Sequence, residues 1–260
     1  MQILELIQKQ LKLDFSSIII ERDGGSENKL DFEIKPRDFL RFAKSDFNNQ
    51  EDKGYINALT NAKRAIDCQI DGAFSQFGIT YDKISNSAHN LISLIDSENS
   101  DLGFKLKLIK ALDFAPSGLI AKSRNLRNKL EHYYQKPQKN EVAEAIELAE
   151  LFILSVENRT RIIEENFFLT DKKNYIKDWE YNNFIQFQFD KEKKIFCLTF
   201  SINKKVIETL NFNENDSLFY SLIKMYNNIN DNIDFTESLR IFLRMINHPI
   251  PNKNIRLEFM

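Results

Sequence analysis

The most constraining feature of the sequence is a change in the spacing of its apolar residues near residue 175. From Pro36 to about Phe168, apolar residues recur every three or four positions, which is the period of an amphipathic helix. In FIQFQFDKEKKIFCLTFSI, residues 184–202, apolar and polar residues alternate on both sides of a charged turn. This alternation predicts a β-hairpin with one buried face. The chain therefore combines a long helical part with a later part that contains strands.

Short polar or Gly/Pro connections divide the helical part into separate helices, and short loops favour antiparallel neighbours. These helices are expected at about 36–48, 52–76, 82–97, 101–114, 117–135 and 139–168. We predict a mainly α protein with three parts. They are a helix and a β-hairpin over residues 1–35, an antiparallel helical bundle over 36–170, and a small α+β module over 175–260. In that module two short helices, about 217–229 and 236–246, and a strand in NIRLEFM are expected to follow the 184–202 hairpin.

Composition narrows the classes of function. The formal net charge of −2 excludes a chain that is basic throughout, although it is compatible with a local basic patch. Cys68 and Cys197 lie far apart, and no Cys/His or carboxylate cluster has the spacing of metal ligands, so neither a metal nor another cofactor is expected. The N-terminus lacks the pattern of a signal peptide, and no apolar run reaches the length of a membrane span. We expect a cytoplasmic protein with free thiols.

The stretch SRNLRNKLEH, residues 123–132, concentrates polar side chains on one side of an expected helix. On a helical wheel, Leu126 and Leu130 fall on the core-facing stripe. The polar side chains share a wide arc, formed by Arg124, Asn125, Arg127, Asn128, Glu131 and His132. Arg127 and His132 lie about 140° apart around the helix, on opposite edges of that arc. One helix alone would not clamp a small group between them easily.

The expected helix at 52–76 offers a second polar stripe. Small apolar residues such as Ala58, Ala62 and Ala65 form its packing side. Its polar residues stand at spacings of four, three and seven, and they are Asn57, Asn61, Arg64 and Asp71. Two neighbouring helices with polar stripes would form a groove if the stripes face one another.

Three segments in this order resemble the HEPN superfamily. They are FLRFAKSDF, YINALTNAKRAIDCQID and RNLRNKLEH, followed by a long helix rich in Ala, Glu and Leu. HEPN proteins are all-helical bundles with the pattern R-x(4–6)-H, and a polar residue often follows the arginine. Arg127, Asn128 and His132 match this pattern, whereas Arg124 stands too far from the histidine. The resemblance covers roughly residues 36–168 and implies a HEPN-like bundle.

The resemblance also implies an activity. Many HEPN proteins are metal-independent endoribonucleases that act as dimers, and a symmetric copy would supply the second wall of a site too wide for one helix. The RNA 2′-hydroxyl would attack the adjacent phosphate, with His132 as general acid or base and Arg127 stabilising the developing charge. Asn128 would orient His132 or a phosphate oxygen. Further contacts to RNA or to these residues are assigned to Arg124, Glu131, Asn61 and Arg64.

Two other interpretations stay open. Some HEPN domains are not nucleases and bind RNA or a protein, and a toxin or defence effector would also have an antitoxin or regulatory partner. Alternatively, Arg127 and Glu131 form a routine surface ion pair and the chain is a helical scaffold. Among the remaining histidines, His248 in INHPIPN is expected in a turn and His89 on a helix surface or in the core.

Overall fold

The computed structural model of the chain describes residues 2–27, 29–80, 86–95, 103–116, 118–119, 121–122, 125, 136–164, 166–249 and 254–260. The chain divides into two compact units, and each unit is built from separate stretches of sequence. The sheet unit comprises Met1–Glu27, Asp82–Ser97 and Ile162–Met260. The helical unit comprises Asn28–Tyr81 and Glu98–Arg161.

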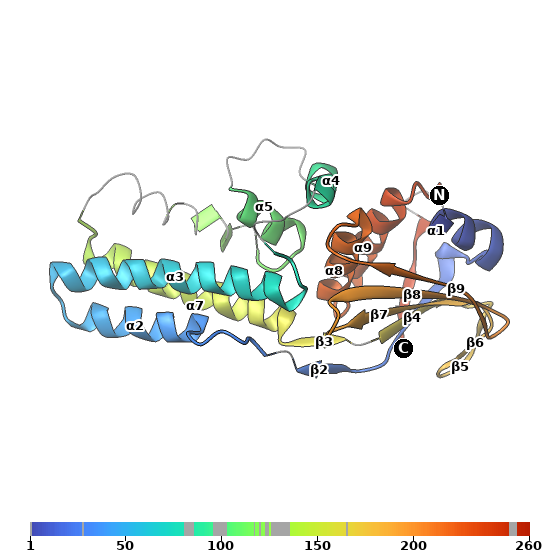
Figure 1. Ribbon diagram of the computed structural model, residues 1–260, viewed down its shortest axis with the longest axis horizontal. Helices are drawn as coiled ribbons and strands as arrows, with labels where there is room; N and C mark the ends of the chain where they lie inside the picture. Colours follow the sequence, from blue (N-terminus) through green and yellow to red (C-terminus); the bar gives the residue numbers. More distant parts are fainter. Residues whose placement is uncertain are drawn as a thin grey trace. The chain divides into compact units, whose positions relative to one another are not determined.

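The sheet unit is built around a six-stranded sheet in the order β10-β1-β4-β7-β8-β9 (Figure 1). Its strands are β1 (Ile18–Arg22), β4 (Asn166–Asp171), β7 (Phe184–Asp190), β8 (Ile195–Ile202), β9 (Lys205–Phe212) and β10 (Leu257–Phe259). The sheet is mixed, because β1 and β10 run parallel while every other neighbouring pair is antiparallel. Two short ribbons complete the β structure, β2 (Gly25–Glu27) with β3 (Ile162–Glu164) and β5 (Tyr175–Lys177) with β6 (Glu180–Tyr181).

One face of this sheet forms the core of the unit. Alternate residues of β4, β7 and β8 are buried, in keeping with the two-residue period of a strand. Two helices cover this face, α8 (Ser217–Asn228) and α9 (Asn232–Met245). Phe167 of β4 stacks on Phe187 of β7 with ring centroids 4.5 Å apart, and it also contacts Tyr226 of α8 and Phe235 of α9.

The N-terminal segment belongs to the same unit. It comprises α1 (Gln2–Glu5), the π-helical turn η1 (Leu6–Leu11) and the 3₁₀ turn η2 (Phe15–Ser17), and η1 packs against β8. The buried carboxylate of Asp171 accepts hydrogen bonds from the backbone N–H groups of Asp14, at 2.7 Å, and Asn174, at 2.9 Å. This side chain therefore ties the N-terminal segment to the end of β4. A further helix, α4 (Asn86–Ile95), packs against α8.

In the helical unit, α2 (Pro36–Asn48), α3 (Asp52–Gln76) and α7 (Lys139–Thr160) pack against one another, and α5 (Phe104–Ala111) lies between the last two in sequence. The ion pairs Arg37–Glu157 and Lys44–Glu150 link α2 and α7, and the two helices run in opposite directions. From the first pair to the second, the residue number increases along α2 and decreases along α7, which is the pattern of antiparallel packing.

The predicted mainly α class, a HEPN-like helical bundle with a small α+β module, is wrong. The chain combines helices with a six-stranded mixed sheet that takes strands from both ends of the chain. The error begins at the expected helix 139–168, which ends at Thr160, since Ile162–Glu164 and Asn166–Asp171 are strands. Apolar spacing in this segment fits either structure, and pairing of β4 with β1 and β7 decides in favour of a strand.

Other predicted elements have mixed outcomes. The helices at 36–48 and 52–76, the hairpin at 184–202 and the helices and strand after it are confirmed. Near the N-terminus, β1 and β2 do not form the expected hairpin with each other, because β1 joins the large sheet and β2 pairs with β3. Most of the expected helix 117–135 lies outside the described residues.

A first prediction concerns the close approach of α2 and α3. A Cβ atom at Gly54 would lie 2.6 Å from the backbone oxygen of Asp46, so Gly54→Ala forces the helices apart. We expect a loss of about 1–3 kcal/mol in the free energy of unfolding, although alanine ordinarily favours a helix over glycine. Chemical denaturation measures it. Gly118→Ala is the matched control, because a Cβ there meets nothing within 4 Å. Equal effects of the two substitutions would contradict the packing argument.

A second prediction concerns pH. His248 lies in the turn after α9, as expected from the sequence, with its ring 5.0 Å from that of Phe15. Burial lowers the pKa of His248 below its ordinary value of 6.5. The unfolded chain therefore binds a proton at this residue more readily than the folded chain. This contribution to stability is present above about pH 6.5 and is lost as the pH falls through the folded-state pKa.

Urea denaturation at pH 5.5 and pH 7.5 tests this prediction. His248→Gln should reduce the difference in unfolding free energy between the two pH values. His89→Gln is the control, because His89 is exposed on α4. An unchanged pH dependence in the His248 variant would refute the assignment.

Candidate functional site

The predicted half-site lies outside the described residues. This holds for Arg124, Arg127, Asn128, Glu131 and His132 alike. Their roles therefore stay predictions. The structure instead describes the chain on both sides of the half-site and two of the residues that were expected to assist it.

The described chain on either side is attached to opposite ends of α3. Lys105 of α5 pairs with Asp71 near the end of α3, at 2.6 Å, and Lys136 pairs with Asp52 at its first residue. The two α3 residues are separated by about 28 Å along the helix axis, at ~1.5 Å per residue. His132 precedes Lys136 by four positions in the sequence.

Asn61 and Arg64 stand on the N-terminal half of α3. The Asn61 side-chain amide donates a hydrogen bond to the Asp46 carboxylate of α2 at 2.9 Å. Asn61 therefore fastens α2 to α3, which is a structural use of a residue predicted to contact RNA. Arg64 is exposed. The polar stripe of α3 is thus divided, with Asn61 bonded to α2, Asp71 bonded to α5 and Arg64 directed to solvent.

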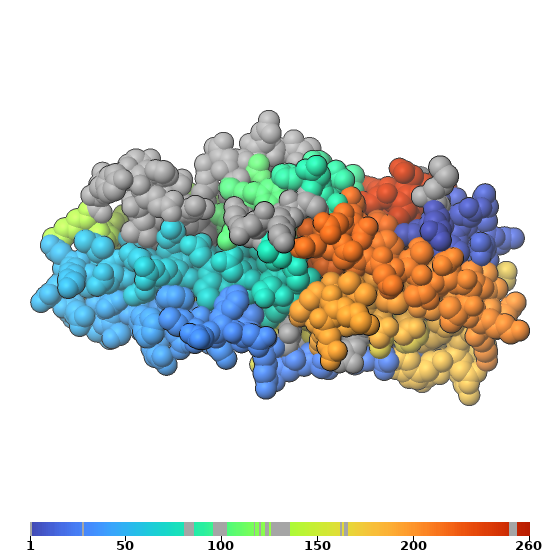
Figure 2. Space-filling view, viewed as in Figure 1, coloured from blue at the N-terminus to red at the C-terminus, as the bar shows by residue number. Residues whose placement is uncertain are grey.

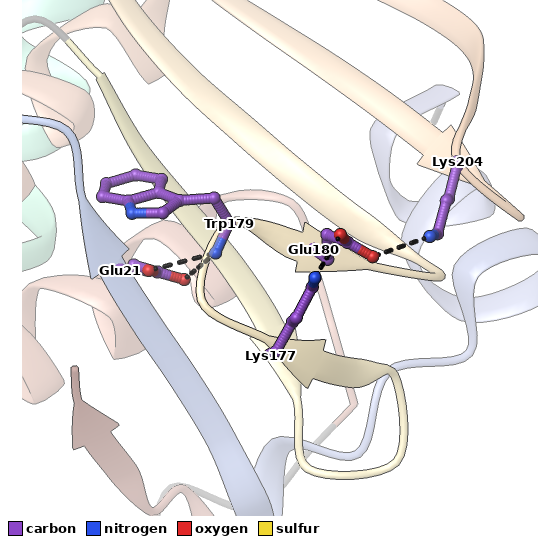
Figure 3. A network of polar contacts seen from close by, with 5 residues as sticks. All are labelled: Glu21, Lys177, Trp179, Glu180 and Lys204. Carbon is purple, nitrogen blue, oxygen red and sulfur yellow. Dashed lines mark hydrogen bonds and ion pairs between the residues drawn. The ribbon is translucent and has the colours of Figure 1, made fainter.

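A second candidate site, which sequence reasoning missed, lies at the β5–β6 hairpin of the sheet unit. The Glu21 side chain of β1 is only 5% exposed. Its two carboxylate oxygens accept the backbone N–H of Trp179 at 3.2 and 3.1 Å (Figure 3). One of them also accepts the Tyr181 hydroxyl. A buried carboxylate on the large sheet therefore holds the tip of the small hairpin.

This attachment supports an unusual backbone conformation. Trp179 has a φ of 63°, a left-handed conformation that bulky residues rarely adopt. Such a conformation persists where surrounding contacts over-determine it, and the bonds to Glu21 are such contacts. The indole ring packs edge-to-face on Phe168, with ring centroids 5.9 Å apart and planes at 84°. Even so, Trp179 stays 50% exposed. The hairpin thus holds an aromatic ring at the surface.

Charged residues flank the turn of this hairpin. Figure 3 shows Lys177 and Lys204 directed at the Glu180 carboxylate from two sides, at 3.0 and 3.1 Å. Hydrogen bonds from these two lysines lower the pKa of Glu180. Because all three side chains are largely exposed, these ion pairs contribute little to stability. They do connect β6 to the turn between β8 and β9.

The tyrosines of the hairpin are poor candidates for acid–base catalysis. Burial, and then the hydrogen bond to Glu21, raise the pKa of Tyr181 well above its ordinary value. The hydrogen bond to Asp178 raises the pKa of Tyr175 to about 12. Both hydroxyls stay protonated near neutral pH. The arrangement therefore suits binding rather than proton transfer.

One sequence signal pointed to this site. Trp179 is the only tryptophan of the chain, and it stands in KDWEY between charged residues rather than in an apolar stretch. A tryptophan in such a segment is a poor core residue. Its carboxylate partner could not be identified, because Glu21 is 158 positions away in the sequence.

Metal and thiol chemistry receive no support from the residues that the structure describes. Among them no group of His, Cys, Asp and Glu side chains is arranged to hold a metal ion. Cys68 and Cys197 are free and partly buried, and burial raises the pKa of the Cys68 thiol to about 11. In the described parts of the chain no helix is both long and apolar enough to cross a bilayer.

Comparison of the chain with protein-family models, with curated proteins and with solved structures finds no match. The resemblance to the HEPN superfamily therefore stays a prediction from the motif and the order of segments.

A third prediction tests the attachment of the β5–β6 hairpin. Glu21→Gln removes the negative charge and replaces one of the two acceptor oxygens with an N–H donor, so the Trp179 N–H keeps one acceptor atom and meets a donor at the other position. We expect a loss of about 1–3 kcal/mol in the free energy of unfolding. Fluorescence of the single tryptophan should also become more sensitive to acrylamide quenching. Glu180→Gln is the matched control on the same hairpin, and little change is expected there. A Glu21 variant that behaves like the Glu180 variant would show that the buried carboxylate does not hold the hairpin.

Proposed function

We propose that the chain is an RNA-cleaving protein whose half-site is formed by Arg127, Asn128 and His132 in the helical unit. The observation that carries the proposal is the pair of attachments to α3. Lys136–Asp52 and Lys105–Asp71 attach described residues that precede and follow the half-site in the sequence to one helix. His132 stands four positions before Lys136 in the sequence, and Asn57, Asn61 and Arg64 follow Asp52 along α3. These attachments support the convergence of two polar stripes that the sequence predicts.

The proposed reaction needs only the groups that these residues supply. The RNA 2′-oxygen attacks the adjacent phosphorus, the bond to the 5′-oxygen breaks, and a 2′,3′-cyclic phosphate and a 5′-hydroxyl form. One proton leaves the 2′-hydroxyl and one is delivered to the 5′-oxygen, and His132 is suited to either transfer near neutral pH. Arg127 stays charged and can bind two phosphate oxygens as charge develops. Asn128 orients the imidazole or a phosphate oxygen.

A second copy of the chain is part of the proposal. Arg127 and His132 are separated by about 140° around their expected helix, so one helix presents them to different sides. A twofold-related copy would place the arginine of one protomer near the histidine of the other. We propose a cytoplasmic homodimer, a toxin or defence effector whose activity a partner protein would regulate.

A non-catalytic RNA-binding module is the second candidate. The exposed ring of Trp179 with Lys177 and Lys204 nearby favours it, because aromatic rings and lysines bind single-stranded nucleic acid without cleaving it. Retained RNA binding without any cleavage would identify this alternative.

A fourth prediction tests cleavage. In EDTA, the purified chain should cut a labelled RNA and leave 2′,3′-cyclic phosphate ends, while DNA of the same sequence stays intact because it lacks the nucleophile. His132→Ala should slow cleavage by about 10²–10⁴-fold, and Arg127→Ala should slow it to a similar degree. Gel analysis of the products measures both.

The matched controls are His89→Ala and Arg41→Ala. His89 and Arg41 are exposed, on α4 and α2 respectively. Both controls should cleave like the parent chain, and circular dichroism should show that all four variants are folded. Equal cleavage by the parent chain and the two half-site variants would refute the proposed function.

A further inference from the structure

The second face of the large sheet differs from the core face over β4, β7, β8 and β9. Six side chains of this face are polar, uncharged and partly or fully exposed, and we call these six the polar sheet face. It consists of Asn166, Gln186, Gln188, Thr199, Thr209 and Asn211. Figure 2 shows in orange that the part of the chain around residue 200 reaches the surface over a broad area. On this face of β7 the charged Asp190 stands at the end of the strand, beyond Gln186 and Gln188.

Strand register arranges these side chains in two rows. In one row Asn166 pairs with Gln188, which faces Cys197, which faces Asn211. In the other row Gln186 pairs with Thr199, which faces Thr209. Paired residues on one face lie about 5 Å apart, so each row presents hydrogen-bonding groups at close, regular spacing.

One contact between the rows and one within the second row hold side chains in place. The Gln186 amide donates to the Asn166 side-chain oxygen at 3.0 Å, and the hydroxyls of Thr199 and Thr209 are 3.4 Å apart. Gln188 and Asn211 are exposed. Amide groups both donate and accept hydrogen bonds, as the edges of nucleobases do. The rows therefore match the chemistry of unpaired bases and of ribose hydroxyls.

The aromatic cluster of the β5–β6 hairpin continues the second row. Phe168 is the cross-strand partner of Gln186, and on its other side it pairs with Glu21. Trp179 stands against Phe168 with about half of its surface exposed. An indole ring is a stacking platform for a base of any sequence. The ring and the amides therefore belong to one continuous surface.

Lysines outnumber carboxylates at both ends of the strands. The turn between β7 and β8, residues 190–194, reads DKEKK. At the other end, Lys177, Lys204 and Lys205 accompany Asp178 and Glu180. Backbone phosphates bind such cations, whereas bases prefer the uncharged centre. A strand of eight residues spans about 26 Å, which is the length of a few extended nucleotides.

We propose that the polar sheet face and Trp179 bind a short segment of single-stranded RNA. This inference deepens the proposed function, on which it rests, by assigning the substrate a second contact surface in the sheet unit. Trp179 stacks on one base, Gln186, Gln188 and Asn211 bond to base edges and 2′-hydroxyls, and the terminal lysines contact phosphates. Glu21 acts as a positioning residue, since it holds the backbone of Trp179 and does not touch RNA.

A fifth prediction tests this surface in the full-length chain with the His132→Ala substitution, so that bound RNA is not cut. Fluorescence anisotropy with a fluorescein-labelled 12-nucleotide single-stranded RNA measures the dissociation constant. Trp179→Ala should weaken binding by about 10-fold. Gln188→Glu should weaken it severalfold, because a carboxylate then repels the phosphates. Gln188 is exposed, and its substitution leaves the aromatic cluster around Trp179 unchanged.

The controls match each change in chemistry. Phe42→Ala removes an exposed aromatic ring from the helical unit, and Gln10→Glu adds a charge to the N-terminal segment. Both should bind RNA like the parent. Unchanged affinity in both Trp179→Ala and Gln188→Glu would overturn the inference. Equal affinity for DNA of the same sequence would overturn RNA as the ligand, and tight binding of unlabelled protein or polysaccharide competitors at this face would assign it to another class of partner.

The outcomes separate the two proposals. Weakened RNA binding in the Trp179 and Gln188 variants, together with absence of cleavage by the parent chain, would refute the ribonuclease and retain the RNA-binding face. Unchanged binding in these variants, together with loss of cleavage in the Arg127 and His132 variants, would refute the face and retain the ribonuclease.

Discussion

Burial of one aromatic face of the sheet beneath α8 and α9 is the interaction on which the sheet unit depends. Phe167 and Phe187, both fully buried, stack at its centre, and rings from both helices close over them. Truncation of one such ring typically costs about 3–5 kcal/mol, which is a large fraction of a domain's stability. Because this face supplies the core, the side chains on the opposite face of β7–β9 do not pack under α8 and α9. That face can therefore carry polar side chains and an exposed tryptophan.

The Glu21 attachment shows how the two faces cooperate. β1 occupies an inner position in the sheet because it is paired on both sides, with β4 and β10. Its side chains alternate, so neighbours of Glu21 enter the core while its carboxylate emerges beneath the β5–β6 hairpin. A rigid strand thus supports a strained tryptophan backbone. In the helical unit, Asn61 and Asp71 of α3 bond to α2 and α5, and the Lys44–Glu150 ion pair joins α2 to α7.

Local patterns predicted many elements correctly and the fold class wrongly. The limits of α2 and α3 follow from Pro36, the polar connection after Asn48 and the helical spacing beyond it. The end of α7 could not be found in this way, because β4 becomes a strand only through partners far away in the sequence. For the candidate sites, sequence supplied the Arg127–His132 pattern and the polar stripe of α3. It did not indicate that Asn61 would bond to Asp46, since that contact depends on how closely α2 and α3 pack at Gly54.

The sequence by itself determined which segments are amphipathic helices, which residues alternate in the β7–β8 hairpin, and where histidine, arginine and tryptophan stand. These properties depend on neighbours within a few positions, so residue spacing is sufficient to predict them. Only the tertiary structure decided that β1 and β10 join the same sheet as β4 and β7, and that Glu21 meets Trp179. Such contacts join residues more than a hundred positions apart. They form because burial of the aromatic face offsets the entropy lost in closing those long loops. The spacing of neighbouring residues does not predict which distant segments will gain this burial.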